Sequence, residues 1–121
     1  MNNKILLLDD EVSLLDLLGD FVEDMGHDVE LFSNPILALE SVENATSDYK
    51  MIITDHTMPE LSGLSLISKV REFNKDIPCI LTSGTAFDEI ESLIKSDPNF
   101  YYLKKPYKKI ELEKLLTEIN S

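Results

Sequence analysis

Carboxylates, hydroxyls and ammonium groups occur directly after four separate short apolar runs of this chain. They are Asp9 and Asp10, Asp55, Thr82 and Ser83, and Lys104 and Lys105. Short apolar runs rich in branched residues are typical of buried strands. If these strands lie parallel in one sheet, their carboxyl ends share an edge, and the polar groups that follow them converge there.

The convergence of these groups indicates a particular chemistry. Three carboxylates that lie close together repel one another unless a cation joins them, and Mg²⁺ commonly takes one or two carboxylates with waters and phosphate oxygens. A carboxylate is also a nucleophile toward phosphorus and can form an aspartyl phosphate. The metal and a lysine then offset the charge of the transferring group. A hydroxyl can donate a hydrogen bond to a phosphoryl oxygen.

Asp55 also has a plainer interpretation, because an aspartate at the carboxyl end of a strand is a common turn starter. Apolar residues run up to Thr54, and Pro59, which cannot continue a strand, closes the segment. On this stretch alone, a capping aspartate and a functional carboxylate both fit. Complementary polar groups after three other strands favour the functional carboxylate.

Five apolar runs alternate with five stretches of helical periodicity. We expect strands at 4–8, 29–32, 51–54, 78–81 and 100–103, with helices at 12–25, 35–45, 64–74, 87–96 and 110–119. The residues that mark the apolar sides of these helices include Leu14, Ile36, Phe73 and Ile110. Such alternation predicts a parallel sheet with right-handed crossovers and helices on both faces.

Taken together, these motifs resemble those of response-regulator receiver domains, the phosphoacceptor modules of two-component signalling. The motifs are the acid pair in Leu-Leu-Leu-Asp-Asp-Glu, the block Asp-His-Thr-Met-Pro with Gly63 after it, Thr82-Ser83-Gly84 and Lys104-Lys105-Pro106. The resemblance covers essentially all 121 residues. It implies a flavodoxin-like α/β fold, a doubly wound five-stranded parallel sheet with five helices. The implied strand order is 2-1-3-4-5, which the chemotaxis regulator of this family exemplifies.

The resemblance implies a role for each residue around Mg²⁺. Asp55 resembles the phosphoacceptor, Asp10 the acid that contacts the metal directly, and Asp9 the acid that acts largely through water. The backbone carbonyl of Thr57 resembles the third protein ligand. His56 should point to the opposite side of the strand, as a packed or surface histidine rather than a catalytic one.

The resemblance extends to the switch residues. Ser83, which a small residue follows, matches the switch hydroxyl better than the threonine before it. Lys105 matches the phosphate-binding lysine, and its bond to Pro106 is expected to be cis. Tyr102, three residues before Lys105, matches the aromatic rotamer switch. Lys104 is an addition to the family pattern and is expected to be solvated.

Composition limits the class of protein and its surroundings. A chain of 121 residues with 43% hydrophobic residues fits one domain, 1–121, that folds without metal or disulfide staples. The single cysteine, Cys79, is expected in the core of a reduced, cytoplasmic protein. The chain shows no secretory leader pattern and no apolar run of membrane-spanning length. A net charge of −12 argues against nucleic acid as a direct partner.

The first functional hypothesis is a phosphorylation-dependent switch or relay. A sensor histidine kinase or a histidine phosphotransfer protein donates a phosphoryl group to Asp55. The face formed by the fourth helix, the fifth strand and the fifth helix then changes its preference for a downstream protein target. Such a domain catalyses its own phosphoryl transfer and autodephosphorylation and is not a turnover enzyme.

Other functions remain to be weighed. A phosphorylation-independent binding or dimerisation module is disfavoured because every position that the chemistry needs is filled. An aspartate-dependent phosphatase needs a second acid where this chain has Thr57. A weak homodimer is compatible with Lys104, Lys108 and Lys109 facing residues 1–49 of a second copy, which hold twelve acids and one base. A free-standing regulator and an excised domain of a hybrid kinase or longer regulator both fit.

Overall fold

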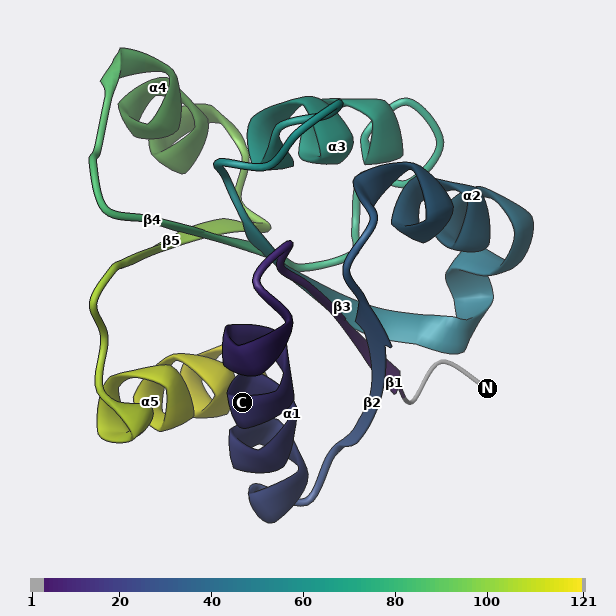
Figure 1. Ribbon diagram of the computed structural model, residues 1–121. Helices are drawn as coiled ribbons and strands as arrows, with labels where there is room; N and C mark the ends of the chain where they lie inside the picture. The colour runs from purple at the N-terminus through teal and green to yellow at the C-terminus, as the bar shows by residue number, and fades with distance from the viewer. Residues whose placement is uncertain (1–3, 121) are drawn as a thin grey trace.

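Five parallel strands form a single sheet in the order β2-β1-β3-β4-β5 (Figure 1). The computed structural model describes residues 4–120. The strands are β1 Lys4–Leu8, β2 Asp28–Phe32, β3 Tyr49–Asp55, β4 Cys79–Ser83 and β5 Phe100–Lys104. This is the strand order that the resemblance implied, and the strand positions predicted from the apolar runs are confirmed with small shifts at their ends.

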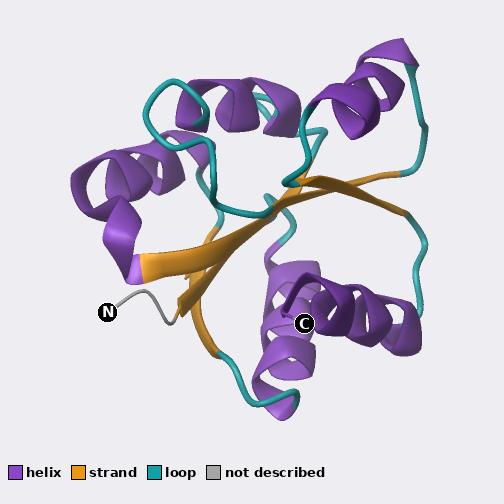
Figure 2. Ribbon diagram, turned by 180° about the vertical axis from the view of Figure 1, so that it is seen from behind, coloured by secondary structure: helices purple, strands orange, loops and turns teal. Residues whose placement is uncertain are grey.

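Helices cover both faces of the sheet. They are α1 Val12–Asp24, α2 Pro35–Ala45, α3 Gly63–Val70, α4 Asp88–Ser96 and α5 Lys109–Asn120, with a short 3₁₀ turn, η1 Thr46–Asp48, before β3. Figures 1 and 2 show α1 and α5 on one face, and α2, α3 and α4 on the other. Within residues 4–120, no helix is long and apolar enough to cross a membrane.

Alternation along the strands divides the core into two clusters, one under each layer of helices. In β1, Ile5 and Leu7 pack in the cluster that includes Leu15 of α1 and Leu112 of α5. The alternate residues of β1 pack on the other face with α2, α3 and α4. Both faces are covered, so β1, β3 and β4 are apolar almost throughout.

The ends of α1 and α2 follow from local chemistry. The side chain of Asn34 accepts hydrogen bonds from the backbone N–H groups of Ile36 and Leu37 at 2.8 and 3.3 Å, and Pro35 occupies the first helical position. Beyond α1, Gly26 has φ +93°, a left-handed conformation that glycine adopts without a Cβ clash. Both boundaries agree with those predicted from the sequence.

The apolar sides of four helices were predicted partly wrongly. Leu14, Ile36, Phe73 and Ile110 are exposed. In α1 the buried stripe is Leu15, Leu18 and Val22, and in α2 it is Pro35, Ala38, Leu39 and Val42. Each stripe follows the three-and-four spacing of one helix face, so an apolar residue just off that spacing points to solvent.

Helix α3 ends at Val70, before the predicted end near Asn74. The side-chain oxygen of Asn74 accepts hydrogen bonds from the backbone N–H groups of Asp76 and Ile77 at 2.9 and 3.1 Å. This local arrangement competes with helix continuation and turns the chain toward β4.

Arg71 connects the end of α3 to the loop between α4 and β5. Its Nε lies 2.7 Å from Asp97 Oδ2, and its two terminal nitrogens donate to the carbonyls of Asn74 and Asn99, each at 3.1 Å. The side chains of Arg71 and Asp97 are largely buried. Their charges are therefore screened less than those of an ion pair at the surface.

We expect Arg71→Ala to lower the free energy of unfolding by about 2–4 kcal/mol, because it leaves a largely buried carboxylate and two carbonyls without this donor. Urea denaturation followed by circular dichroism measures the change. Lys69→Ala, an exposed lysine on the same helix, is the control and should stay within about 0.5 kcal/mol of the parent chain. Equal effects of the two substitutions would contradict the role given to Arg71.

Candidate active site

The polar residues singled out in the sequence lie at the carboxyl ends of four neighbouring strands. Asp9 follows β1 and Asp55 ends β3, so these two acids flank the point where the strand order reverses. Thr82 and Ser83 end β4, and Lys105 follows β5. The parallel register pairs Asp55 with Thr82, and both residues are buried.

The three acids form a compact cluster. One carboxylate oxygen from each of Asp9, Asp10 and Asp55 lies within 4.8 Å of the others. Asp9 is 5% exposed and Asp55 is 9% exposed, whereas Asp10 is open to solvent. The Oδ1 atom of Asp9 also accepts a hydrogen bond from the backbone N–H of Glu11 at 2.9 Å, which fixes its orientation.

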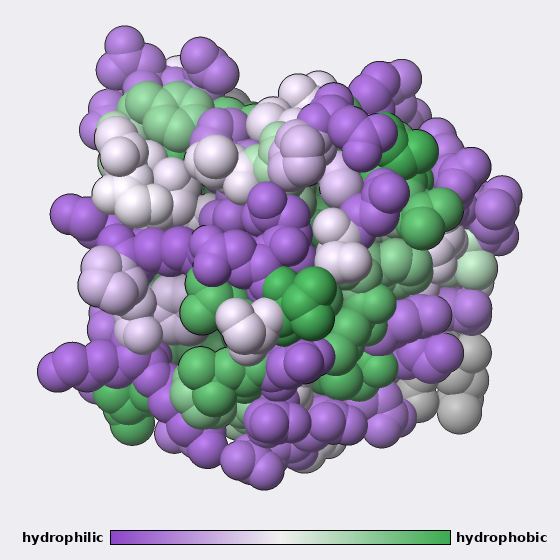
Figure 3. Space-filling view, in the orientation of Figure 1, coloured by the Kyte–Doolittle hydropathy of each residue, from purple (hydrophilic) through white to green (hydrophobic). Residues whose placement is uncertain are grey.

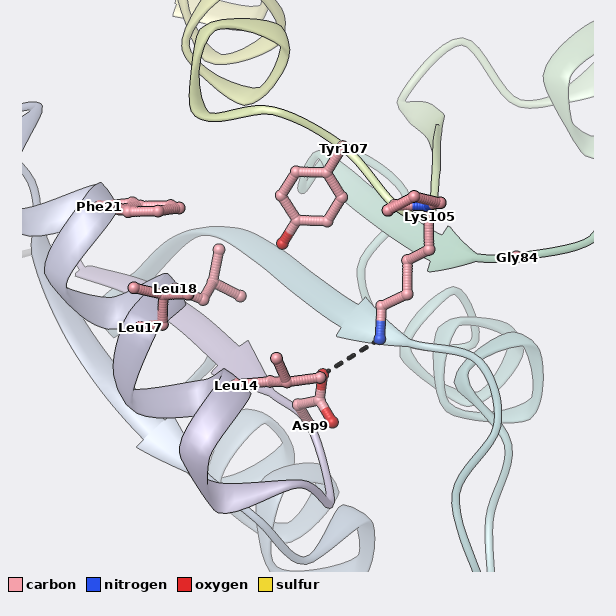
Figure 4. Close-up of a pocket in the computed structure, with 9 residues that line it drawn as sticks. Asp9, Leu14, Leu17, Leu18, Phe21, Gly84, Lys105 and Tyr107 are labelled. Atoms are coloured by element: carbon pink, nitrogen blue, oxygen red, sulfur yellow. Dashed lines mark hydrogen bonds and ion pairs between the residues drawn. The ribbon is translucent and has the colours of Figure 1, made fainter.

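The ammonium group of Lys105 bridges the two buried acids. Its Nζ lies 3.1 Å from Asp55 Oδ1 and 3.3 Å from Asp9 Oδ2, and Figure 4 shows its side chain extending from the end of β5 toward Asp9. The peptide bond between Lys105 and Pro106 is cis, as expected from the resemblance. One positive charge therefore faces two buried negative charges, with a third carboxylate beside them.

Burial and charge act on this pair in opposite directions. Burial raises the pKa of the Asp55 carboxyl, and the nearby Lys105 offsets this increase only in part. Burial lowers the pKa of the Lys105 ammonium, but its contacts with Asp55 and Asp9 outweigh that effect and raise the pKa. Both pKa values are therefore raised. Lys105 faces two carboxylates, which stabilise its charged form, whereas the charge of Asp9 destabilises the charged form of Asp55.

The cluster fits a hard divalent cation. Its ligand atoms are carboxylate oxygens, which Mg²⁺ prefers, and the cluster carries three acids for one lysine. Asp10 has no ion pair with a lysine or arginine in the part of the chain that the structure describes, so its carboxylate is available to a cation. Thr57 lies exposed in the β3–α3 loop, two residues beyond Asp55.

Ser83 and Tyr102 are joined by a hydrogen bond. The Tyr102 hydroxyl donates to the Ser83 carbonyl at 2.9 Å, and the half-buried Tyr102 ring packs against the core. The Ser83 hydroxyl donates to the Thr85 carbonyl at 2.9 Å and accepts from the Thr85 N–H at 3.2 Å. In this conformation the Ser83 hydroxyl is thus engaged by its own loop, an arrangement that the sequence did not reveal.

The β3–α3 loop is sterically tight. The backbone N–H of Gly63 donates to the His56 carbonyl at 2.9 Å. A Cβ atom on Gly63 would lie 2.4 Å from the Asp55 carbonyl oxygen and 2.6 Å from Leu81 Cδ1. Glu60 in the same loop has φ +71°, which is uncommon for a residue with a side chain. The position at 63 therefore requires glycine, because the end of β3 and the Leu81 side chain approach it so closely.

His56 is a packed histidine, as predicted. Its ring lies 4.9 Å from the Phe87 ring, and its Nδ1 is buried without a hydrogen-bond partner among the described residues. Lys104 is exposed, as also predicted. Sequence reasoning missed Tyr107, whose half-buried ring lies close enough to the site for Asp9 and Asp55 to affect its pKa. The signal available was its position immediately after the motif Lys105-Pro106.

The fold and the site define a class of protein: a doubly wound α/β domain with a carboxylate cluster and a bridging lysine at the topological switch point. The sequence matches the family described as the response regulator receiver domain over residues 5–117. This chain therefore belongs to the receiver-domain family of two-component systems. Phosphorylation of an aspartate and magnesium binding are general features of this family.

Three relatives illustrate the similarity. The chemotaxis protein CheY1 of Helicobacter pylori is 33% identical over 116 residues, which cover 93% of each chain. CheY4 of Vibrio cholerae is 25% identical with a TM-score of 0.85, covering 98% of this chain and 99% of that one. The receiver domain of the sensor histidine kinase PA1611 of Pseudomonas aeruginosa is 26% identical with a TM-score of 0.82, covering 100% of both chains. It was solved with a magnesium ion coordinated in the active site cleft.

Other relatives are longer than this chain. It covers 36% of a transcriptional regulatory protein and 12% of a sensor kinase. Receiver domains thus occur among these relatives both as chains of similar length and as parts of larger proteins.

We expect Gly63→Ala to lower the free energy of unfolding by about 1–3 kcal/mol, since a backbone oxygen cannot yield as a flexible side chain can. Gly84→Ala is the matched control, because a Cβ on Gly84 meets no atom within 4 Å. That control should change stability by less than about 0.5 kcal/mol. Chemical denaturation of both variants measures the difference, and similar values would show that the loop relaxes.

We expect Asp10→Asn to weaken Mg²⁺ binding by roughly tenfold or more relative to the parent chain. We expect Asp9→Asn to weaken it less. Asp9 already pairs with Lys105, whereas the Asp10 carboxylate is available to the ion. Magnesium titration followed by NMR measures both affinities. Asp20→Asn removes the same charge from an exposed position on α1 and serves as the control. The reverse order of Asp9 and Asp10 would refute this assignment.

Proposed function

We propose that residues 1–121 form one receiver domain that accepts a phosphoryl group on Asp55 in a magnesium-dependent reaction. The observation that supports this most directly is the bridge from Lys105 to both Asp55 and Asp9, beside the available carboxylate of Asp10. This arrangement holds a nucleophile, a cation-binding cluster and a fixed positive charge at one edge of the sheet.

Each residue of the site has a proposed role. Asp10 would hold Mg²⁺ directly and Asp9 largely through water, and Asp55 and the backbone carbonyl of Thr57 would supply further oxygens. When bound, the ion offsets the negative charge of the carboxylates and of the transferring phosphoryl group. Lys105 is the second source of positive charge, and because it belongs to the protein it is in place before any donor arrives.

In the transfer step, a carboxylate oxygen of Asp55 forms a bond to phosphorus. The bond between phosphorus and the donor atom breaks, and its electron pair leaves with the donor. Lys105 then exchanges its contact with Asp55 for one with a phosphoryl oxygen. The Ser83 hydroxyl, now bonded to Thr85, turns to donate to another phosphoryl oxygen. The same site later admits water, which hydrolyses the aspartyl phosphate.

The movement of Ser83 is the proposed link to the partner face. The Tyr102 hydroxyl is bonded to the Ser83 carbonyl, so a shift of the β4–α4 loop changes the position available to the Tyr102 ring. That ring packs in the core cluster beneath α4. We propose that the face formed by α4, β5 and α5 thereby changes its affinity for a downstream protein target.

The proposed phosphodonor is a sensor histidine kinase or a histidine phosphotransfer protein in the cytoplasm. A weak homodimer through the lysines of β5 and α5 is compatible with the charges, with one correction. Lys109 Nζ lies 3.3 Å from Asp24 Oδ2 and stands over the Phe21 ring, so Lys109 is engaged within the chain. Lys104 and Lys108 are the exposed lysines that remain for a second copy.

We expect wild type to gain one phosphoryl group when it is incubated with acetyl phosphate and Mg²⁺, and Asp55→Asn to gain none, because the amide is not a nucleophile. Intact-protein mass spectrometry measures the gain. Asp76→Asn, which alters an exposed acid away from the cluster, is the control and should be phosphorylated like wild type. A loss of the added mass with time would support autodephosphorylation. An equal gain in wild type and Asp55→Asn would reject Asp55 as the acceptor.

A further inference from the structure

A groove runs between α1 and the segment that follows β5, and it opens at the phosphoacceptor site. Its volume is about 500 Å³, and its apolar wall is formed by Leu14, Leu17, Leu18 and Phe21 of α1. Tyr107 and Pro106 form the opposite wall, and Asp9 and Lys105 close one end. Figure 4 shows the side chains of α1 on one side of this space and Tyr107 on the other.

The apolar wall is exposed at two of its four residues. Leu14 is 41% exposed and Leu17 is 49% exposed. Figure 3 shows hydrophobic residues gathered over the part of the surface where α1 lies, among hydrophilic residues. The wall is contiguous along one side of α1, and contiguous apolar surface of this kind marks binding sites more often than single exposed apolar residues do.

Two polar groups line the otherwise apolar groove. Lys105 supplies an ammonium group at the end nearest Asp55, from which its Nζ is 3.1 Å distant. The Tyr107 hydroxyl points into the groove (Figure 4). That hydroxyl is a neutral donor around neutral pH, because the ordinary pKa of tyrosine is about 10 and burial raises it further. An apolar cavity with a few convergent polar groups is the usual form of a small-molecule site.

We propose that this groove binds the acyl part of small acyl phosphates, so that the domain prefers phosphodonors with an aromatic acyl group over acetyl phosphate. The proposal rests on Asp55 as the acceptor. With the phosphoryl group beside Lys105 and Asp55, the acyl group lies at the mouth of the groove. A methyl group leaves the apolar wall of α1 in water, whereas a phenyl ring covers Leu14 and Leu17.

The reaction balances without another reactant besides Mg²⁺. A carboxylate oxygen of Asp55 bonds to phosphorus, the bond between phosphorus and the acyl oxygen breaks, and the acyl group leaves as a carboxylate with that electron pair. The products are the aspartyl phosphate and benzoate or acetate. The Tyr107 hydroxyl is placed to donate to the departing carboxylate, whose charge it stabilises.

The experiment compares benzoyl phosphate with acetyl phosphate on the intact 121-residue chain in the presence of Mg²⁺. Intact mass measured over time, at donor concentrations below saturation, gives a rate for each donor. Each rate is divided by the rate of phosphoryl transfer from that donor to pyridine in solution, which breaks the same bond between phosphorus and the acyl oxygen and so corrects for intrinsic reactivity. We expect a corrected ratio of benzoyl to acetyl of roughly tenfold, the lower end of the discrimination that an apolar pocket gives.

Two substitutions of exposed leucines test the groove directly. Leu17→Ser and Leu14→Ser remove parts of the α1 wall, and each should lower the corrected ratio by roughly threefold or more. Leu37→Ser, a 54% exposed leucine on α2, is the matched control and should leave the ratio unchanged. Because all three positions are exposed, the variants should fold, which circular dichroism checks.

Binding is read separately by NMR. Benzoate at constant ionic strength should shift the resonances of Leu14, Leu17 and Tyr107, and acetate should not. A corrected ratio near one in wild type, or an equal ratio in wild type and Leu17→Ser, would overturn the groove proposal. Absence of mass gain with both donors would instead reject Asp55 as acceptor. Benzoate shifts at the groove would then still support the groove as a site for apolar carboxylates, and their absence would reject it.

Discussion

Repulsion among three carboxylates is the constraint on which the site depends. Asp9, Asp10 and Asp55 place oxygens within 4.8 Å of one another, and two of the three are buried. Lys105 offsets part of this charge, and water reaches Asp10. The fold tolerates this repulsion because its stability comes from other parts of the structure. The apolar residues of β1, β3 and β4, buried on both faces, hold the ends of these strands together against that repulsion.

The alternation of side chains along the strands places the acid cluster and the proposed switch residues on different faces of the sheet. Asp9 and Asp55 continue the rows of β1 and β3 that face α1 and α5, and Lys105 reaches them from β5. Ser83 continues the row of β4 that includes Cys79 and Leu81, which face α2, α3 and α4. In the proposed function, the two faces are linked at the end of β4. There, Tyr102 holds the Ser83 carbonyl, and Thr85 holds the Ser83 hydroxyl.

The sequence predicted the sheet, its helices and the convergence of the polar residues because those features depend on local periodicity and on one rule about parallel strands. It did not predict which apolar residues lie just off a buried stripe. Leu14 and Leu17 of α1 have the same residue type as the buried Leu15 and Leu18, and the direction of each depends on how the helix rotates against the sheet. Rotation of a packed helix is a tertiary property.

The hydrogen-bond partners of the site residues were equally hidden from the sequence. The hydroxyl of Ser83 has partners both in its own loop and, in the proposed function, on the phosphoryl group, and residue type alone does not choose between them. The same holds for Lys109, whose pairing with Asp24 depends on the proximity of α1 and α5. Residue type and spacing therefore predict that a group lies at an edge of the sheet. Its hydrogen-bond partners depend on the three-dimensional arrangement of the chain.

The net charge of −12 also affects which ligands approach the site. Residues 1–49, which include α1 and the acid pair, hold twelve acids and one base, so the field around the site attracts divalent cations and repels anionic donors. A phosphodonor therefore has to be held by something other than long-range attraction. Close to the site, Lys105 supplies a local positive charge, and the apolar wall of α1 supplies contacts that do not depend on charge. An acidic surface interrupted by an apolar groove thus favours donors that bring apolar area as well as a phosphoryl group.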